Sequence, residues 1–159
     1  MTGLLPPLPP AVIRTQNFKT MAYRPPYTDP DSILVEAPHP STLEPKELLK
    51  QCEFRTGRVS GPGGQHRNRN ATGIWIVHLP TQLESKATER REQKVNRSVA
   101  VERLRLRLAL KARCATNRNV HEPSELWKSR RQGTRLPVNP KHSDYPALLA
   151  EALDVIVAR

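Results

Sequence analysis

The alternation of apolar and polar positions predicts a small sheet of three strands in the middle of the chain. Apolar and charged side chains alternate from Cys52 to Val59, which is typical of a strand with one covered face. The stretch from Thr72 to Leu79 is apolar on both alternating faces, so it is predicted as the central strand, at least partly covered on both sides. Pro80–Gln82 forms a tight connection, and the more polar stretch from Leu83 to Thr88 is predicted as an edge strand.

A long helix is predicted to follow, from Thr88 or Glu89 to about Cys114. Acidic residues near its start and basic residues near its end suit the helix dipole. At 100° per residue its apolar positions fall into two arcs, with a basic stripe between them. The first arc is Ala100, Val101, Leu104 and Leu108, the second is Val95, Val99, Leu106 and Leu110, and the stripe is Arg103, Arg107 and Lys111. We expect one arc to pack on the sheet and the second on another element.

The two flanks of this region differ in character. Residues 1–40 hold 9 of the 16 prolines and are predicted to be an extended or disordered leader. A short helix through Gln51 is expected to be capped by Ser41 or Thr42. Residues 115–159 are predicted to form a helical extension, with a short helix at 124–131 and a final helix capped by Asp144. The apolar side of that final helix is expected to cover the second arc, and it consists of Leu148, Leu149, Ala152, Leu153 and Ile156.

These elements together predict an α+β fold. It consists of a small, mainly antiparallel sheet, a long packed helix, a protruding glycine-rich loop and a helical C-terminal extension. The expected parts are the leader at 1–40, a main domain at 41–114 and the extension at 115–159.

Charge points to the kind of partner. Residues 55–118 contain 15 Lys or Arg and 4 Asp or Glu, whereas the rest of the chain has 11 of each sign. The whole formal net charge of +11 therefore lies in the middle of the chain. Such a concentration suits a polyanion, above all nucleic acid, and a merely solvated basic surface is the alternative.

Other composition features narrow the class further. Cys52 and Cys114 are isolated, so a disulfide is possible but not implied, and the pattern fits a reducing compartment. The histidines lack metal-ligand spacing and no apolar run could span a bilayer, so we expect no metal, no cofactor and no membrane partner. The first 20 residues lack acids and carry Arg14 and Lys19. Location in the cytoplasm is therefore expected, with an organelle (mitochondrion or plastid) as the alternative and Met21 as an alternative start.

The strongest candidate for chemistry is the glycine-rich turn Ser60-Gly61-Pro62-Gly63-Gly64-Gln65-His66. Glycines allow a backbone to approach a ligand closely. A neutral Gln at the tip acts through position and dipole rather than through proton transfer. A plain hairpin loop and a disordered linker are alternatives, whereas a nucleotide-phosphate loop lacks its Lys-Ser/Thr ending. Its position between a strand and a basic, Asn-rich turn favours a functional role.

The order of several motifs resembles one known family. After the glycine turn come Asn68-Arg69, then His78-Leu79-Pro80-Thr81, then Glu89-Arg90-Arg91-Glu92-Gln93-Lys94-Val95-Asn96-Arg97. This order and spacing, over roughly residues 50–112, are similar to the catalytic domain of class I peptide chain release factors. They are also similar to the short relatives that rescue stalled ribosomes.

The resemblance implies hydrolysis of the peptidyl-tRNA ester in the ribosomal peptidyl transferase centre, in translation termination or in the rescue of stalled ribosomes. We expect this hydrolysis to be codon-independent, because the Pro-rich leader is too small for codon-reading domains. Gly63, Gly64 and Gln65 would be the catalytic residues, with the Gln65 backbone N–H donating to developing negative charge. Gln65 is also the candidate for N5-methylation by a glutamine methyltransferase. Ribosomal RNA and peptidyl-tRNA are the implied partners. The expected RNA contacts are His66, Arg67, Asn68, Arg69, Arg103, Arg107 and Lys111.

This sequence departs from the family pattern at several points. Arg67 replaces a small aliphatic residue, and Gln82 replaces a turn glycine. Codon-reading domains would not fit in the Pro-rich leader, and residues 119–159 carry 6 basic and 5 acidic residues rather than a strongly basic tail. Two alternatives therefore stay open: a non-catalytic RNA- or ribosome-binding protein, and a release factor that needs a separate decoding partner.

Overall fold

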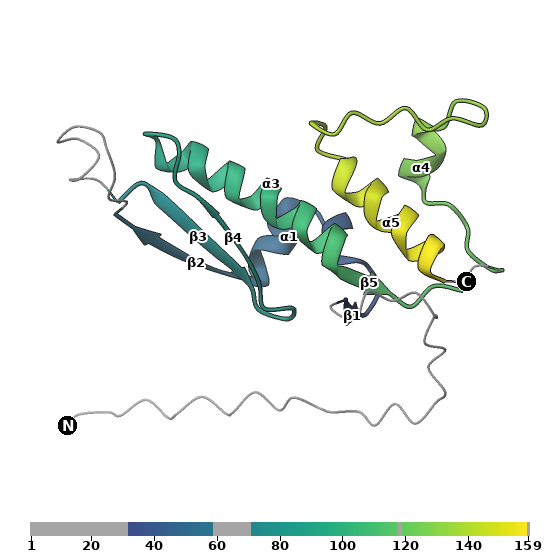
Figure 1. The fold of residues 1–159 in the computed structure, drawn as a ribbon, viewed down its shortest axis with the longest axis horizontal. Coiled ribbons are helices and arrows are strands. Elements are labelled where there is room, and N and C mark those ends of the chain that lie inside the picture. The colour runs from purple at the N-terminus through teal and green to yellow at the C-terminus, as the bar shows by residue number, and fades with distance from the viewer. Residues whose placement is uncertain (1–31, 59–70, 118, 159) are drawn as a thin grey trace, which may run out of the picture.

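The computed structural model describes residues 32–58, 71–117 and 119–158, and it confirms the predicted α+β fold. Strands β2, β3 and β4 form an antiparallel sheet with β3 in the centre, and β1 pairs with β5 in parallel (Figure 1). The strands are β1 (Ile33–Val35), β2 (Cys52–Gly57), β3 (Gly73–His78), β4 (Leu83–Ala87) and β5 (Ala112–Cys114). The helices are the 3-10 helix η1 (Pro40–Thr42), then α1 (Pro45–Lys50), α3 (Gln93–Lys111), α4 (Glu125–Arg130) and α5 (Tyr145–Val157).

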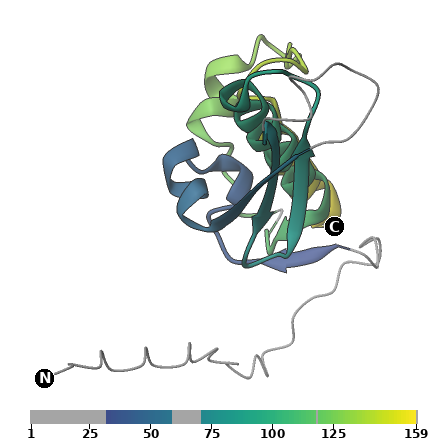
Figure 2. The ribbon, with the colours of Figure 1, turned by 90° about the vertical axis from the view of Figure 1, so that its left-hand side faces the viewer.

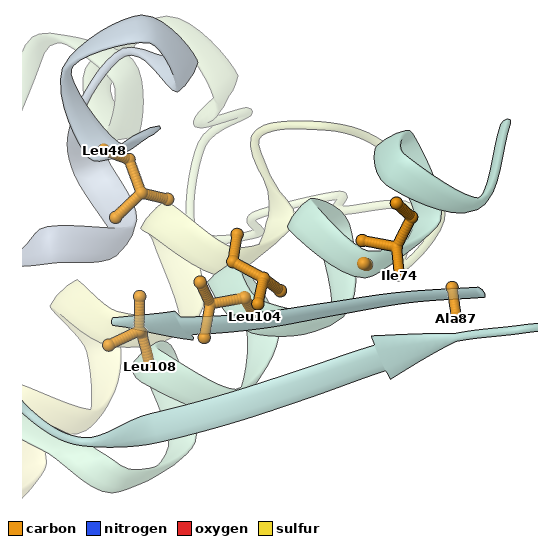
Figure 3. Close-up of a cluster of buried hydrophobic side chains, with 7 residues drawn as sticks. Leu48, Ile74, Ala87, Leu104 and Leu108 are labelled. Carbon is orange, nitrogen blue, oxygen red and sulfur yellow. The ribbon is translucent and has the colours of Figure 1, made fainter. Parts of the chain in front are cut away.

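The core lies between α3 and one face of the three-stranded sheet. Ile74 and Ile76 of β3 face the first apolar arc of α3, in which Leu104 and Leu108 are fully buried. Leu48 of α1 closes the far end of this core, away from Ile74 (Figure 3), and α1 lies beside the strands in the view of Figure 2. Burying each such leucine stabilises the fold by about 1.5–3 kcal/mol.

The strand predictions are confirmed, with shorter bounds. β2 ends at Gly57 instead of Val59, and its alternation of half-buried and exposed residues holds as far as Arg55. The central strand is buried at Ile74 and Ile76 and half-buried at Trp75 and Val77, so both of its faces are covered in part.

The long helix is shorter than predicted at both ends. It begins at Gln93, because the backbone of Arg90 is held by the side chain of Asn96 in a bent segment before the helix. At the other end the chain leaves the helix as β5, whose residues pair with β1. Arg113 of β5 folds back and donates hydrogen bonds to the carbonyls of Ala109, Leu110 and Ala112, thereby capping the helix C-terminus.

The prediction for the second arc of α3 is wrong. Val95, Leu106 and Leu110 of this arc are 38%, 36% and 47% exposed. Helix α5 packs on α3 but leaves these residues exposed, and Ile156 of its expected apolar side is itself 60% exposed. The buried residues of α5 are Pro146, Ala147, Leu148, Ala150 and Asp154.

Polar contacts explain where α5 docks. The Cys114 backbone N–H donates to Asp154 Oδ1 at 3.2 Å, and Ser41 Oγ donates to the Pro146 carbonyl at 3.4 Å. Arg105 of α3 donates to the carbonyls of Ser41 and Ser143. These bonds hold α5 beside β5 and η1, on a different side of α3 from the second arc.

Helix capping agrees with the sequence only in part. The predicted helix from Ser41 or Thr42 to Gln51 is divided into η1 and α1, and η1 is capped by His39. Ser124 caps α4 through Trp127 N–H. Asp144 occupies the N-cap position of α5, but its carboxylate pairs with Arg130 instead of capping the helix.

Gln82, which the resemblance marks as the replacement of a turn glycine, lies in the β3–β4 turn. Gln82 has a φ of 56°, in the left-handed region that favours glycine, and its side-chain amide donates to the Leu79 carbonyl at 2.6 Å. A non-glycine residue in this region costs about 1–2 kcal/mol. The amide hydrogen bond offsets part of that cost.

We therefore expect Gln82→Gly to raise the free energy of unfolding by about 0.5–1 kcal/mol, because relief of the strained φ outweighs one exposed hydrogen bond. Gln82→Ala, which keeps the strain and loses the bond, is expected to lower it. Urea unfolding followed by circular dichroism measures both. A Gln82→Gly protein less stable than Gln82→Ala would contradict this account of the turn.

The buried carboxyl of Asp154 predicts an unusual pH dependence. Burial raises the pKa of Asp154 to about 6 from 3.8, against the lowering effects of the Cys114 N–H, Arg113 and His121. A pKa raised in the folded state contributes stability that is fully present below about pH 4 and is lost as pH rises through 6. Asp154→Asn keeps a hydrogen-bond acceptor and removes the buried charge. It is expected to raise the free energy of unfolding at pH 8 by about 1–3 kcal/mol and to have little effect at pH 4.

Asp144 provides the matched control, because the hydrogen bond from Arg130 lowers its pKa. Asp144→Asn is expected to reduce stability at pH 8 and to have less effect at low pH. Urea titrations at both pH values check the pair, and a loss of stability in Asp154→Asn at pH 8 would show that attraction to Arg113 outweighs burial.

Candidate functional site

The glycine-rich segment connects two paired strands. Gly57 at the end of β2 lies opposite Gly73 at the start of β3, so the connecting residues leave and re-enter the sheet side by side. The predicted catalytic residues Gly63, Gly64 and Gln65 lie outside the described residues. So do the predicted RNA contacts, which are His66, Arg67, Asn68 and Arg69. Their roles and the protrusion of the loop therefore stay predictions.

The C-terminal base of this connection is fastened to α3. Asn96 Nδ2 donates to the Thr72 carbonyl at 2.7 Å and to the Arg90 carbonyl at 2.9 Å, while its Oδ1 accepts from the Arg90 N–H at 3.0 Å. Gln93 Nε2 donates to the Ala71 carbonyl at 3.4 Å. Asn96 is fully buried, so its amide holds the first residues after the loop against the start of the helix.

The His78-Leu79-Pro80-Thr81 motif builds the opposite end of the sheet. His78 is fully buried, with Nδ1 2.8 Å from Thr81 Oγ1 and Nε2 3.0 Å from Gln51 Oε1. Burial lowers the pKa of His78, which favours the neutral ring. With Nε2 protonated, the ring donates to Gln51 and accepts from Thr81, so this motif shapes the β3–β4 turn and joins it to the end of α1.

The basic stripe of α3 covers the edge of the sheet. Arg103 donates to the Lys86 carbonyl at 2.9 Å, and Arg107 donates to the Glu84 carbonyl at 2.7 Å. Both carbonyls belong to edge strand β4, whose open edge is protected in this way. Contact between the stripe, which ends at Lys111, and phosphates stays a prediction.

Glu89 lies before the start of α3, not in its first turn as predicted. Its Oε1 accepts a hydrogen bond from Arg103 at 2.7 Å, outside the helix. This bond, with the Thr88 N–H, lowers the pKa of Glu89 to about 2. The acid therefore helps to orient the first arginine of the stripe.

Other chemistry is little supported in the described part of the chain. It contains no group of three or more His, Cys, Asp or Glu placed to hold a metal ion, and its helices lack the combination of length and apolar composition that a bilayer-spanning helix needs. Cys52 and Cys114 are free thiols, and burial raises the pKa of each to about 11.

Gln93 and Asn96 belong to the Glu89–Arg97 motif, and the sequence pattern predicts no structural role for either. An Asn within a helical motif was the available signal, because such a residue is costly to bury unless its amide is satisfied.

Comparison with known proteins identifies the family. Residues 45–142 match the model of the RF-1 domain, so the chain belongs to the RF-1 domain family, the catalytic domain of class I release factors. This confirms the resemblance seen in the sequence.

The individual relatives are named as peptide chain release factors. The chain is 39% identical over 71 residues to "Peptide chain release factor 1-like, mitochondrial" of Rattus norvegicus, covering 45% of this chain and 19% of that protein. It is 32% identical over 97 residues to "Peptide chain release factor 2" of Campylobacter concisus, covering 61% and 26%. It is 46% identical over 67 residues to "Peptide chain release factor 1" of Streptococcus sanguinis, covering 42% and 18%. The chain thus aligns with about a fifth to a quarter of the length of these relatives.

The buried amide of Asn96 makes a stability prediction. Asn96→Ala is expected to lower the free energy of unfolding by about 2–4 kcal/mol, because it leaves a cavity and unpaired backbone groups at Thr72 and Arg90. Asn119→Ala, at an exposed position, serves as the control and is expected to change it by less than about 0.5 kcal/mol. Thermal or urea unfolding measures the difference, and equal effects of the two variants would contradict the role assigned to Asn96.

Proposed function

We propose that this chain promotes hydrolysis of the ester between a nascent peptide and transfer RNA on the ribosome, without reading a codon. The observation that carries the proposal is the Gly63-Gly64-Gln65 sequence, which stands in the connection from β2 to β3 within the matched domain. The names of the relatives, all peptide chain release factors, support the reaction class. Codon independence rests on the resemblance to the short rescue factors.

The chemistry proposed for Gln65 needs no titrating group from this chain. Its backbone N–H stabilises the oxyanion or the leaving oxygen as charge develops, and its side chain admits and places the attacking water. Gly63 and Gly64 let the backbone pass between walls of RNA. Protons are handled by hydroxyl groups of the RNA and the substrate.

The proposed partners are the ribosomal RNA of the peptidyl transferase centre and peptidyl-tRNA. The net charge of +11, all of it within residues 55–118, supports an RNA partner. Gln65 is also proposed as the site of N5-methylation by a glutamine methyltransferase. The proposed division of the chain is a leader at 1–40, a catalytic domain at 41–114 and an extension at 115–159.

The proposed location is the cytoplasm, with an organelle as the alternative. Relatives named mitochondrial, such as the rat protein, support the organelle, as do the acid-free first 20 residues. A fluorescent fusion of the full chain, compared with one that lacks residues 1–20, distinguishes the two.

A second candidate function is release that depends on a separate decoding partner. The observation that favours it is the extension at 119–159, whose helix α5 packs against α3 and which is nearly balanced in charge. Such an extension is unlike a basic tail that would enter an RNA channel. A folded extension of this kind could instead dock a protein.

The main proposal is tested by peptide release from ribosomes that carry peptidyl-tRNA in the P site and an empty A-site codon. Gln65→Ala removes the side chain that places the water, and Gly64→Ser disturbs the backbone that presents the Gln65 N–H. Each is expected to lower the rate of release by about 100- to 1,000-fold. Binding to the ribosome, measured by co-sedimentation, is expected to persist. Gln132→Ala changes a glutamine in the extension and is expected to leave release unchanged.

Each alternative predicts a different result. A wild-type protein that binds ribosomes and releases nothing, alone or with cell extract, would favour the non-catalytic binding function. Release that appears only after extract is added would favour the decoding partner. Equal rates for wild type and Gln65→Ala would contradict the role of the glycine turn.

A further inference from the structure

A groove lies on the helix-facing side of the sheet, at the end that leads into the 59–70 connection. Its lining residues come from β2, β3 and the first turns of α3, and it has a volume of about 310 Å³. They are Phe54, Thr56, Ile74, Gln93, Lys94 and Arg97. The floor is apolar at Phe54 and Ile74, while the three residues from α3 are exposed and polar. Figure 3 places Ile74 at this end of the core, away from Leu48 and Leu108.

The guanidinium of Arg97 lies over the ring of Phe54 in this groove. The guanidinium carbon of Arg97 lies 4.4 Å from the centroid of the Phe54 ring. Phe54 is half-buried and packs against the core, so its position is set by the fold. A guanidinium stacked on an aromatic ring is attracted by the ring and held parallel to it. Because Arg97 is exposed, the other face of its guanidinium is available to a planar group.

The charge of the groove selects an anion. Lys94 and Arg97 are its ionisable lining residues, and no acid is among the six residues that line it. The nearby Glu89 is paired with Arg103. A planar, apolar group joined to a negative charge is therefore the ligand that matches both the stacking surface and the cations. A nucleotide has both parts.

We propose that this groove binds one unstacked nucleotide of single-stranded RNA. The base lies on the Arg97 guanidinium above the floor of Phe54 and Ile74, and the phosphate contacts Lys94. The side chain of Gln93 also donates to the Ala71 carbonyl, so Gln93 links the bound nucleotide to the chain directly after the 59–70 connection. The inference rests on the proposed function in that RNA must surround this end of the domain during peptide release.

The outer face of the sheet is the competing RNA surface, and it is less suitable. Trp75 lies there between its cross-strand neighbours Arg55 and Lys86. Its ring lies against Gly57, where an added Cβ would be 2.9 Å from a ring carbon, so backbone covers part of the indole. Glu53 pairs with Arg55 on this face and reduces its positive charge.

The test compares variants of the groove with matched variants of the outer face. Arg97→Lys keeps the charge but loses the planar group, and Lys94→Gln removes a charge. Arg55→Lys and Lys86→Gln make the same changes on the outer face. The full chain is titrated against a short fluorescein-labelled single-stranded RNA of mixed sequence, and anisotropy gives the dissociation constant. Circular dichroism checks that each variant is folded.

Arg97→Lys is expected to weaken RNA binding by about tenfold, because it removes one stacking contact. Lys94→Gln is expected to weaken binding. It is also expected to reduce the slope of log K against log salt concentration by about one unit, because one phosphate contact is lost. The outer-face variants are expected to change affinity by less than about twofold. In peptide release, Arg97→Lys is expected to raise KM and leave kcat unchanged, because the contact forms equally in the ground and transition states.

The outcomes separate this inference from the proposed function. Normal release with no change in RNA affinity or KM in Arg97→Lys would overturn the groove site and leave the function intact. If the wild type releases no peptide but Arg97→Lys still weakens RNA binding, the groove site is supported and the proposed function is contradicted. Stronger effects of Arg55→Lys and Lys86→Gln would overturn the groove in favour of the outer face. Retained RNA affinity in Arg97→Lys, with loss of binding to a glutamine methyltransferase, would assign the groove to protein and overturn the proposal.

Discussion

The packing of one face of α3 on β3 is the interaction on which the rest of the molecule depends. A three-stranded sheet alone would leave both of its faces in water, so its apolar side chains need another element to cover them. Ala100, Leu104 and Leu108 cover Ile74 and Ile76, and all five side chains are essentially buried. This contact sets the direction of the helix. Its first turn consequently lies beside the strand ends that carry the glycine-rich connection, and its last turn lies beside β5 and α5.

Each end of α3 is then fastened by polar groups that the core alone would not specify. At the start, the Asn96 amide ties the backbone after the connection to the helix. At the end, Arg113 caps the helix carbonyls, and His39 Nε2 also contacts the Ala112 carbonyl at 3.2 Å. Burial lowers the pKa of His39, so the neutral ring with a proton on Nε2 suits this contact. A rigid attachment at the start matters for the proposed chemistry, since a neutral amide contributes only through accurate position.

The strands of the three-stranded sheet and the family of the chain were predictable, because both can be recognised from patterns of neighbouring residues. Alternation over a few residues marks a strand, and the motifs occur in sequence order. The end of α3 was predicted less well, because β1 is needed to draw Ala112–Cys114 out of the helix. Glu89 likewise finds a stronger partner in Arg103 than in the helix dipole. In each case a contact between distant parts of the chain outweighs a weak local preference.

The strands β2, β3 and β4, the two arcs of α3, the position of the glycine turn and the concentration of positive charge all follow from the sequence alone. Periodicity states which residues share a face, and this information is local. The three-dimensional fold was needed to show that Leu104 is buried while Leu110 is half exposed, and that Arg103 and Arg107 protect the edge of β4. It also brought Phe54 and Arg97 together. Two apolar arcs are equivalent until a partner surface of the right shape covers one of them, and that partner is formed by residues far away along the chain.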